Sequence, residues 1–447
     1  MPHNNTHIPS DDIRARFSKS MSKMYREEVP AYGRLLDLVA DINQSVLDAN
    51  PALKTKLEET DNLERINEER HGAIRLGTAK ELQMIARVFG VMGMRPVSYY
   101  DLTQANVPVH STAFRTTDAK SLTRSPFRVF CSLLRTELIA DDDLRTRAEE
   151  ILAQRDIFTP ALHTLVEKAE KNGGLNEVDT QNFIEQATYT FKWHEDATTD
   201  KAFYEALKNA DPRAADIVCF KGPHINHLTP RTLDIDIIQD DMPKRGMNAK
   251  NVVEGPSPSR SVLLRQTSFK ALTEQVRFHG EAGSHTARFG EIEQRGAALT
   301  PKGRALYDDI LSEVRATIKP ALDGSNAAEY MKVLEEKFTR FPATENEWRL
   351  QKLAYFQYYA KGDIPPNKDL EQLITDGLVD FIPITYEDFL PVSAAGIFSS
   401  NASDKTRQDT FLSSSKDDFE KALGQKVICE FEMYQAMENT SIRAIFG

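Results

Sequence analysis

Two histidines and a strand carboxylate are the residues of this chain whose types and places could bind a metal ion. His71 opens the segment HGAIR, and His227 lies in HINHLT, and both segments are predicted strands. The third candidate comes from RFGEIEQRG, where Glu291 and Glu293 alternate onto one face of another predicted strand. A carboxylate on the buried side of a strand is costly unless it is paired or bound to a metal. The pattern leaves open which glutamate is the ligand.

Two histidines and one carboxylate on one face of a metal ion leave three coordination positions open. Non-haem Fe(II) oxygenases use this facial arrangement to hold a substrate and O₂ together. The structural alternative is that each histidine is a hydrogen-bonded core residue with no ligand role. At this level, metal binding is a hypothesis that depends on the fold bringing distant residues together.

Arg75 follows His71 by four residues, so both side chains point to the same face of a strand, about 13 Å apart along the chain. Ala73 lies between them and leaves room. A guanidinium in this place can bind the distal carboxylate of a substrate in a bidentate manner. The alternative is a salt bridge to an acidic residue at the rim of a barrel.

Other parts of the sequence narrow the chemistry. The small residues of PVSAAG (391–396) suit close approach of a ligand to the backbone, although a plain turn has the same composition. The chain has no GxGxxG, P-loop, nucleophile elbow or HExxH motif. Nucleotide-binding and serine-hydrolase functions therefore have no support.

The order of predicted elements indicates how the candidate residues are positioned. A strand ending at Gly77 is followed by a helix that Thr78 can cap. Three segments rich in β-branched or aromatic residues come next, at 96–102, 107–117 and 126–138. The same order then returns. It runs through a strand (224–229), a helix (233–246) closed by Gly246, and strand-like segments near 248–254, 261–267, 274–280 and 284–295.

This repeated order predicts an α+β fold built from two paired βαβββ modules, with a half-barrel architecture and helical insertions around it. Pairing of the modules would bring the strands of His71 and His227 together. We expect a helical layer at 1–60, a core at 61–300 with a helical insertion at about 140–210, and a C-terminal segment at 301–447. In the last segment we expect helices at 301–338, 344–360 and 366–375, with Thr300 as an N-cap, and a β-like stretch near 378–400.

Composition describes an ordinary globular protein with an acidic surface. The 447 residues include 56 Lys and Arg against 67 Asp and Glu, for a net charge of −11, so we expect no nucleic-acid partner. The three cysteines have no metal-ligand spacing and are expected to be buried thiols. No apolar run approaches the roughly 18 residues of a membrane span. We therefore expect a cytoplasmic protein without a membrane partner, and the oligomeric state stays open.

Four strings together resemble the 2-oxoadipate dioxygenase/decarboxylase family, also called 2-hydroxyglutarate synthases, within the vicinal-oxygen-chelate superfamily. They are EERHGAIRLG, FKGPHINHLTPRTLDID, RFGEIEQRGAALTPKG and FLPVSAAGIF, and the similarity runs from about residue 65 to 400. The resemblance implies Fe(II) held by His71, His227 and a glutamate. FGEIEQR also resembles the FLEIIQR-type strand of 4-hydroxyphenylpyruvate dioxygenases, a register that selects Glu291 over Glu293.

The resemblance further implies that Arg75 binds the substrate, with backbone contacts from Val392 and Ser393. The implied reaction converts 2-oxoadipate and O₂ to D-2-hydroxyglutarate and CO₂ in lysine breakdown, so the expected partners are a small 2-oxo acid and O₂. Two alternatives stay open. One is a metal enzyme of the same fold with another reaction, such as extradiol cleavage or isomerisation, and the other is a non-catalytic binding protein.

Overall fold

The computed structural model describes residues 7–59, 63–103, 107–270, 272–286, 288–321, 323–390 and 408–446 of the chain. The chain divides into two units, each with its own hydrophobic core. The first comprises Met1–Ala249, Ser268–Ile292 and Pro391–Val427, and the second comprises Lys250–Thr267, Glu293–Leu390 and Ile428–Gly447. The domain division expected from the sequence, with boundaries near residues 60 and 300, stays a prediction.

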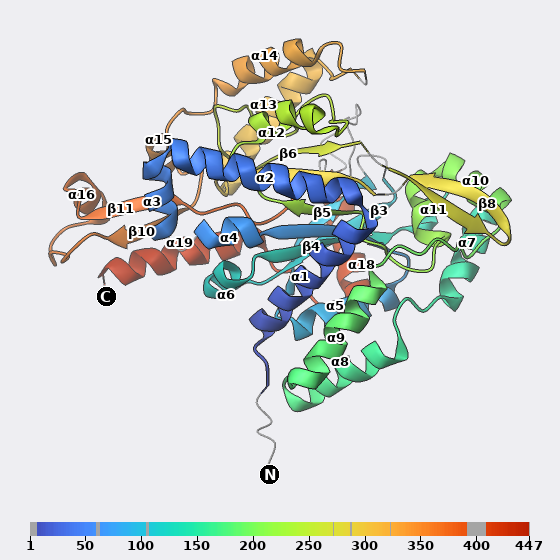
Figure 1. The fold of residues 1–447 in the computed structure, drawn as a ribbon. Helices are drawn as coiled ribbons and strands as arrows, with labels where there is room; N and C mark the ends of the chain where they lie inside the picture. Colours follow the sequence, from blue (N-terminus) through green and yellow to red (C-terminus); the bar gives the residue numbers. More distant parts are fainter. Residues whose placement is uncertain are drawn as a thin grey trace. The chain divides into compact units, whose positions relative to one another are not determined.

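A five-stranded sheet lies at the centre of the first unit (Figure 1). Its strands are β1 (Arg70–Leu76), β2 (Arg95–Asp101), β3 (Val109–Arg115), β4 (Phe127–Leu134) and β5 (His227–Pro230), in the spatial order β2-β3-β4-β1-β5. β1 is parallel to β4 and antiparallel to β5. The helix α5 (Ala79–Val91) follows β1, and Thr78 caps it by accepting a hydrogen bond from the Glu81 backbone N–H. The first βαβββ order is therefore confirmed.

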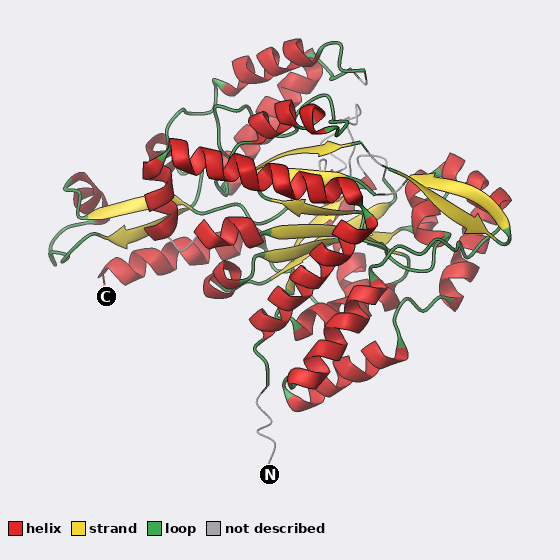
Figure 2. Ribbon diagram, viewed as in Figure 1, coloured by secondary structure: helices red, strands yellow, loops and turns green. Residues whose placement is uncertain are grey.

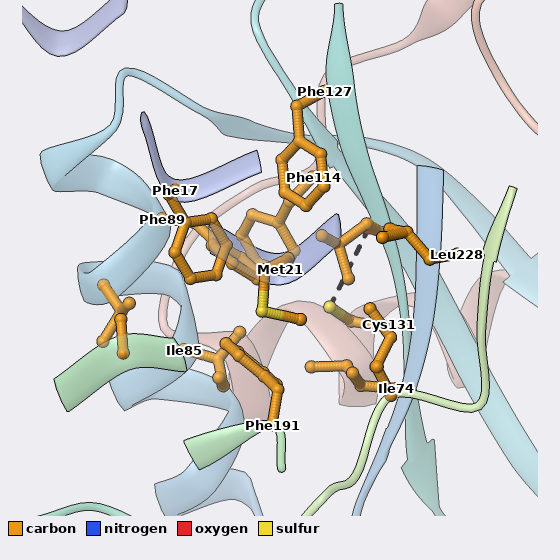
Figure 3. Packing of buried hydrophobic residues seen from close by; sticks show 14 of the residues in the cluster. Phe17, Met21, Ile74, Ile85, Phe89, Phe114, Phe127, Cys131, Phe191 and Leu228 are labelled. Atoms are coloured by element: carbon orange, nitrogen blue, oxygen red, sulfur yellow. Dashed lines mark hydrogen bonds between the residues drawn. The ribbon is translucent and has the colours of Figure 1, made fainter. Parts of the chain in front are cut away.

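The two faces of this sheet differ in chemistry. Because successive side chains of a strand alternate, Ile74 and Leu76 of β1 point to one face and His71, Ala73 and Arg75 to the other. The first face is apolar and packs against α1 (Ser10–Glu28) and α5. Figure 3 shows this packing, with side chains contributed by Phe17, Ile74, Ile85, Phe89, Phe114, Phe127, Cys131 and Leu228. The second face is polar and carries the candidate site residues His71, Arg75 and His227.

A buried arginine anchors α1 to the segments beside it. The Arg14 side chain is fully buried and donates hydrogen bonds to the backbone carbonyl oxygens of Met92, Ser121 and Ser125. Asp11 neutralises the guanidinium at 2.9 Å. In addition, the rings of Phe17 and Phe127 meet edge to face with centroids 5.6 Å apart. The helix α1 is therefore held against the apolar face of the sheet.

The first unit contains further helices besides α1 and α5. Figure 2 shows that the segment between β4 and β5 is largely helical. Gly173 ends α8 in a left-handed conformation with φ of 73°. These helices are α2 (Pro30–Ala49), α3 (Pro51–Glu59), α4 (Leu63–Glu68), α6 (Ala119–Arg124), α7 (Asp142–Gln154), α8 (Pro160–Asn172), α9 (Glu177–Thr190), α10 (Lys201–Ala210), α11 (Pro212–Val218) and α18 (Gln408–Leu423), with a 3₁₀ turn at Thr136–Leu138.

The second module repeats the order of the first with one strand more. After β5 come α12 (Ile235–Asp241), a 3₁₀ turn (Pro243–Arg245), β6 (Leu264–Phe269), β7 (Thr273–Phe278), β8 (Glu281–Thr286) and β9 (Gly290–Arg295). β6 pairs with β9, and β7 with β8. The α+β class is confirmed, but the strand expected near 248–254 is wrong, because Ala249 and Glu254 make only isolated bridges.

The second unit is mainly helical. Its elements are α13 (Pro301–Thr317), α14 (Ala327–Phe338), α15 (Glu345–Leu350), β10 (Phe356–Ala360), α16 (Leu370–Thr375), β11 (Val379–Pro383) and α19 (Glu430–Phe446). Thr300 caps α13, as predicted. The helix predicted over 344–360 is wrong at its end, because residues 356–360 form β10 and pair with β11. Side chains of Glu438 and Ser441 on α19 accept hydrogen bonds from backbone N–H groups of β10.

Two further expectations concern the cysteines, expected to be buried thiols, and the absence of a membrane-spanning segment. Cys131 and Cys219 are buried free thiols, whereas Cys429 is half-buried and also free. Among the described helices, none combines the length and the apolar character that a membrane span requires.

His110 on β3 predicts a pH-dependent stability. Its ring is buried against Phe419 with centroids 4.8 Å apart, and burial, with the charge of Arg135, lowers the pKa of His110 to about 4. The unfolded chain binds this proton near pH 6.5 and the folded chain does not, so this contribution to stability is complete above pH 6.5 and falls as pH drops towards 4. Between pH 7 and 5 we expect a loss of roughly 2 kcal/mol from this group.

The measurement is urea unfolding of the wild type and of His110→Gln at pH 7 and pH 5. The variant should lose less stability over that interval than the wild type. Equal losses in the two proteins would show that His110 does not stay neutral in the folded chain.

Candidate metal centre

Three buried side chains of the first unit meet on the polar face of the sheet. Glu291 Oε2 lies 2.7 Å from His227 Nδ1 and 3.2 Å from His71 Nε2. The two imidazole rings stand almost perpendicular, with centroids 5.4 Å apart. All three residues are 4% exposed or less. Their possible ligand atoms lie within 4.8 Å of one another, which is close enough for one ion to contact all three.

Three strands position these residues. His71 lies on β1, directly opposite Thr229 of β5, and His227 opens β5 opposite Ala73. Glu291 is the second residue of β9 and follows Gly290. A Cβ atom at Gly290 would come 1.8 Å from the Phe269 ring, so only glycine allows β9 to lie this close to β6. The two histidines therefore come from neighbouring strands of one sheet. The carboxylate comes from β9, and Glu291 lies 220 residues after His71 in the chain.

Neighbouring groups set the protonation states of this cluster. Burial would raise the pKa of Glu291, but the hydrogen bonds and charges of His227 and His71 outweigh it and hold that pKa below its ordinary value. Burial lowers the pKa of His227, although Glu291 opposes the effect. Thr229 Oγ1 contacts His227 Nδ1 at 2.8 Å and donates to Glu291 Oε2 at 3.1 Å. The Phe289 ring stacks on His227 with centroids 4.9 Å apart.

This donor set fits a divalent first-row metal ion. Two imidazoles and a carboxylate that its histidine neighbours keep ionised are the ligands that such ions take in N/O sites. A buried carboxylate is costly without a compensating positive charge, and a bound cation would supply that charge beside Glu291. Three protein ligands leave further coordination positions for a substrate.

The other candidate glutamate has a different environment. Glu293 is fully buried, and the Arg295 guanidinium binds both of its oxygens, at 2.7 and 2.8 Å. Arg295 in turn donates to the backbone oxygens of Tyr386 and Asp388. Among the described residues, the group able to hold a metal with His71 and His227 contains Glu291 and not Glu293. The ligand roles themselves stay predictions.

Arg75 lies on the same face of β1 as His71, two positions beyond Ala73. Its side chain is a quarter exposed, and Nη1 contacts Asp216 Oδ2 at 2.7 Å. The positive charge of Arg75 adds to burial in lowering the pKa of His227, which places the guanidinium within electrostatic reach of the cluster. The two other residues expected to bind substrate, Val392 and Ser393, lie outside the described residues.

A second buried cluster was not predicted from the sequence. Asp216 Oδ1 lies 2.7 Å from His285 Nε2 and 3.2 Å from His224 Nε2, and all three side chains are buried. Burial would raise the pKa of Asp216, but the two histidines and Arg75 outweigh it and hold that pKa well below its ordinary value. The string PHINH, with His224 three residues before His227, was the only local hint. Nothing near Asp216 in the sequence marks it.

The chain is similar in sequence to known proteins over most of its length. The family model described as 2-oxoadipate dioxygenase/decarboxylase matches residues 17–401. The chain is 54% identical to a 2-oxoadipate dioxygenase/decarboxylase of Escherichia coli strain K12 over 446 residues, 98% of each chain. It is 52% identical to the protein of that name from Pseudomonas putida over 451 residues, 98% of this chain and 97% of the other.

A solved structure extends the similarity to the fold. The hydroxyglutarate synthase from Pseudomonas putida, in complex with 2-oxoadipate, superposes with a TM-score of 0.92 at 50% identity, covering 99% of this chain and 98% of the other. The similarity therefore includes both units and every strand that carries a candidate ligand. This chain belongs to the 2-oxoadipate dioxygenase/decarboxylase family.

Proposed function

We propose that this protein is an Fe(II)-dependent dioxygenase/decarboxylase that converts 2-oxoadipate and O₂ to D-2-hydroxyglutarate and CO₂. The observation that carries the proposal is the buried group of His71, His227 and Glu291, present in a chain whose residues 17–401 match the family model. The Pseudomonas putida relative of known structure binds 2-oxoadipate. A place in lysine catabolism and a cytoplasmic location stay predictions of the sequence.

The residues of the cluster have a simple division of roles in this proposal. His71, His227 and Glu291 would hold the iron, which supplies the activation of O₂ when bound. Thr229 donates to Glu291 and contacts His227, so it fixes the orientation of two ligands at once. The proposal assigns no acid–base role to a side chain, because the activation of O₂ would come from the metal. C₆H₈O₅ and O₂ give C₅H₈O₅ and CO₂. The substrate's C1 carboxylate leaves as CO₂, the keto carbon becomes the new carboxylate, and the neighbouring methylene is hydroxylated. Each of the last two carbons takes one oxygen atom of O₂, which accepts the four electrons.

Arg75 supplies the recognition of a second carboxylate in this proposal. A 2-oxo diacid has one end that a metal ion chelates and a carboxylate at the far end. A guanidinium on the strand of His71, four residues along and on the same face, suits that far carboxylate. The polar face of the sheet is therefore matched to a substrate with two charged ends. Val392 and Ser393 would add backbone contacts.

The test is oxygen uptake by protein loaded with Fe(II) under anaerobic conditions and then mixed with 2-oxoadipate and ¹⁸O₂. We expect one O₂ consumed per CO₂ released, and 2-hydroxyglutarate that carries label both in its hydroxyl group and in its new carboxylate. Protein loaded with Zn(II) is the control, since zinc has no redox chemistry. Absence of uptake with iron bound would reject the proposal and favour an isomerase or another 2-oxo acid.

A further inference from the structure

We propose that Asp216 is a positioning residue for substrate recognition, which holds the Arg75 guanidinium in place through a buried chain of hydrogen bonds that continues to His285 and Tyr204. The inference rests on the proposed function, because the orientation of Arg75 matters only if an anionic substrate group meets it. It assigns a role to a cluster that the metal centre does not use.

The two carboxylate oxygens of Asp216 have different partners. Oδ2 accepts from Arg75 Nη1 at 2.7 Å, whereas Oδ1 faces His285 Nε2 at 2.7 Å and His224 Nε2 at 3.2 Å. Asp216 itself is 7% exposed and lies in α11, a helix whose N-terminus is capped by Asp211. A carboxylate with both oxygens bound has little freedom to rotate. Arg75 therefore meets a partner that is fixed.

A second layer fixes the histidine that binds Asp216. The Tyr204 hydroxyl contacts His285 Nδ1 at 2.9 Å, and Tyr204 is fully buried. Since Asp216 is ionised and accepts only, His285 donates from Nε2, and its Nδ1 is then the acceptor of the Tyr204 O–H. The Phe220 ring packs on His285 with centroids 4.6 Å apart. The tautomer and the ring orientation of His285 are thus set by its neighbours.

Arginine is the residue that gains most from such a support. Its side chain is long and flexible, and Arg75 is a quarter exposed, so without a partner it would sample several rotamers. Asp216 binds Nη1, and the guanidinium has five N–H groups in a planar fork, so donors are left for a substrate carboxylate. Because the guanidinium is planar, fixing Nη1 also fixes the direction of its other N–H groups.

The same three residues also match a metal-ligand set, and the charges decide between the two roles. Asp216, His224 and His285 have ligand atoms within 4.8 Å of one another. However, the positive guanidinium of Arg75 lies on the carboxylate, where it would repel a bound cation. A hydrogen-bonded support accounts for each of these contacts.

The experiment measures steady-state kinetics of the iron-loaded Asp216→Asn variant with 2-oxoadipate and with 2-oxohexanoate, which has the same length but no distal carboxylate. We expect KM for 2-oxoadipate to rise about tenfold with kcat changed by less than about threefold, and little change with 2-oxohexanoate. Asp196→Asn is the matched control, because it breaks a carboxylate–arginine pair with Arg277 that is exposed, and it should leave both substrates unaffected.

Two further measurements keep the inference falsifiable. Tyr204→Phe removes only a hydroxyl and should shift KM in the same direction by a smaller factor, even if Asp216→Asn folds poorly. In an Arg75→Lys background, Asp216→Asn should cost much less than alone, because both act through one guanidinium. Additive effects would overturn the inference, as would two equivalents of metal in the wild type and one in Asp216→Asn. A wild type that does not oxidise 2-oxoadipate would instead reject the proposed function, and the inference with it.

Discussion

Glu291→Gln is expected to lose its bound iron and to lower turnover of 2-oxoadipate by about 10³-fold or more. Glutamine has the shape of glutamate but no charge, so two neutral imidazoles would be left to hold a divalent ion in a buried place. Removal of one of the three protein ligands should lower activity by more than the 10–100-fold typical when a residue that only orients a ligand is removed. Metal content after dialysis, measured together with oxygen uptake, tests the expectation.

Glu293→Gln is the matched control for this substitution. Glu293 lies two residues further along β9, is equally buried, and is bound by Arg295. Its replacement should lower the thermal unfolding midpoint, since it removes a buried negative charge that the Arg295 guanidinium binds, while the folded protein keeps its iron. If Glu293→Gln lost the metal and Glu291→Gln kept it, the assignment of the ligand would be reversed.

The sequence places Glu291 and Glu293 on a buried strand but does not tell which of them faces the histidines. Alternation along β9 places Glu291 and Glu293 on one face, and both are buried, so periodicity alone cannot separate them. What separates them is their contacts, since one faces two histidines and the other an arginine. The histidines themselves could be predicted, because each lies on the first strand of a repeated order of elements.

Asp216 could not be predicted in the same way. Its partners Arg75 and His285 lie 141 and 69 residues away, and no local pattern marks a helix residue that meets a strand residue at that separation. The fold shows a similar limit. Residues 356–360 lie at the end of the helix predicted over 344–360 but form β10, whose pairing with β11 is a tertiary contact that a local pattern does not show. The strands of the sheet around His71 could be predicted from the alternation of β1 and from the β-branched and aromatic residues of the others.

Arg75→Lys is expected to raise KM for 2-oxoadipate by about 30-fold or more, while turnover of 2-oxohexanoate changes little. Lysine keeps the positive charge but is shorter and has no planar fork, so it cannot bind a carboxylate in a bidentate manner while Asp216 holds it. A site built around a polar substrate group discriminates strongly against the substrate that lacks it, because its own polar groups are then left without partners. The loss should therefore fall on the diacid alone.

The control for Arg75→Lys is Arg277→Lys, which makes the same exchange at an exposed arginine paired with Glu195 and Asp196. That variant should behave as the wild type with both substrates. Metal content should be the same in all three proteins, because Arg75 binds Asp216 and not the histidines of the cluster. An equal loss with the diacid and the monoacid would mean that Arg75 supports the cluster electrostatically rather than the far carboxylate. Unchanged kinetics with the diacid would mean that Arg75 does not bind the distal carboxylate of the substrate. The substrate would then have to be sought among 2-oxo acids with one carboxylate.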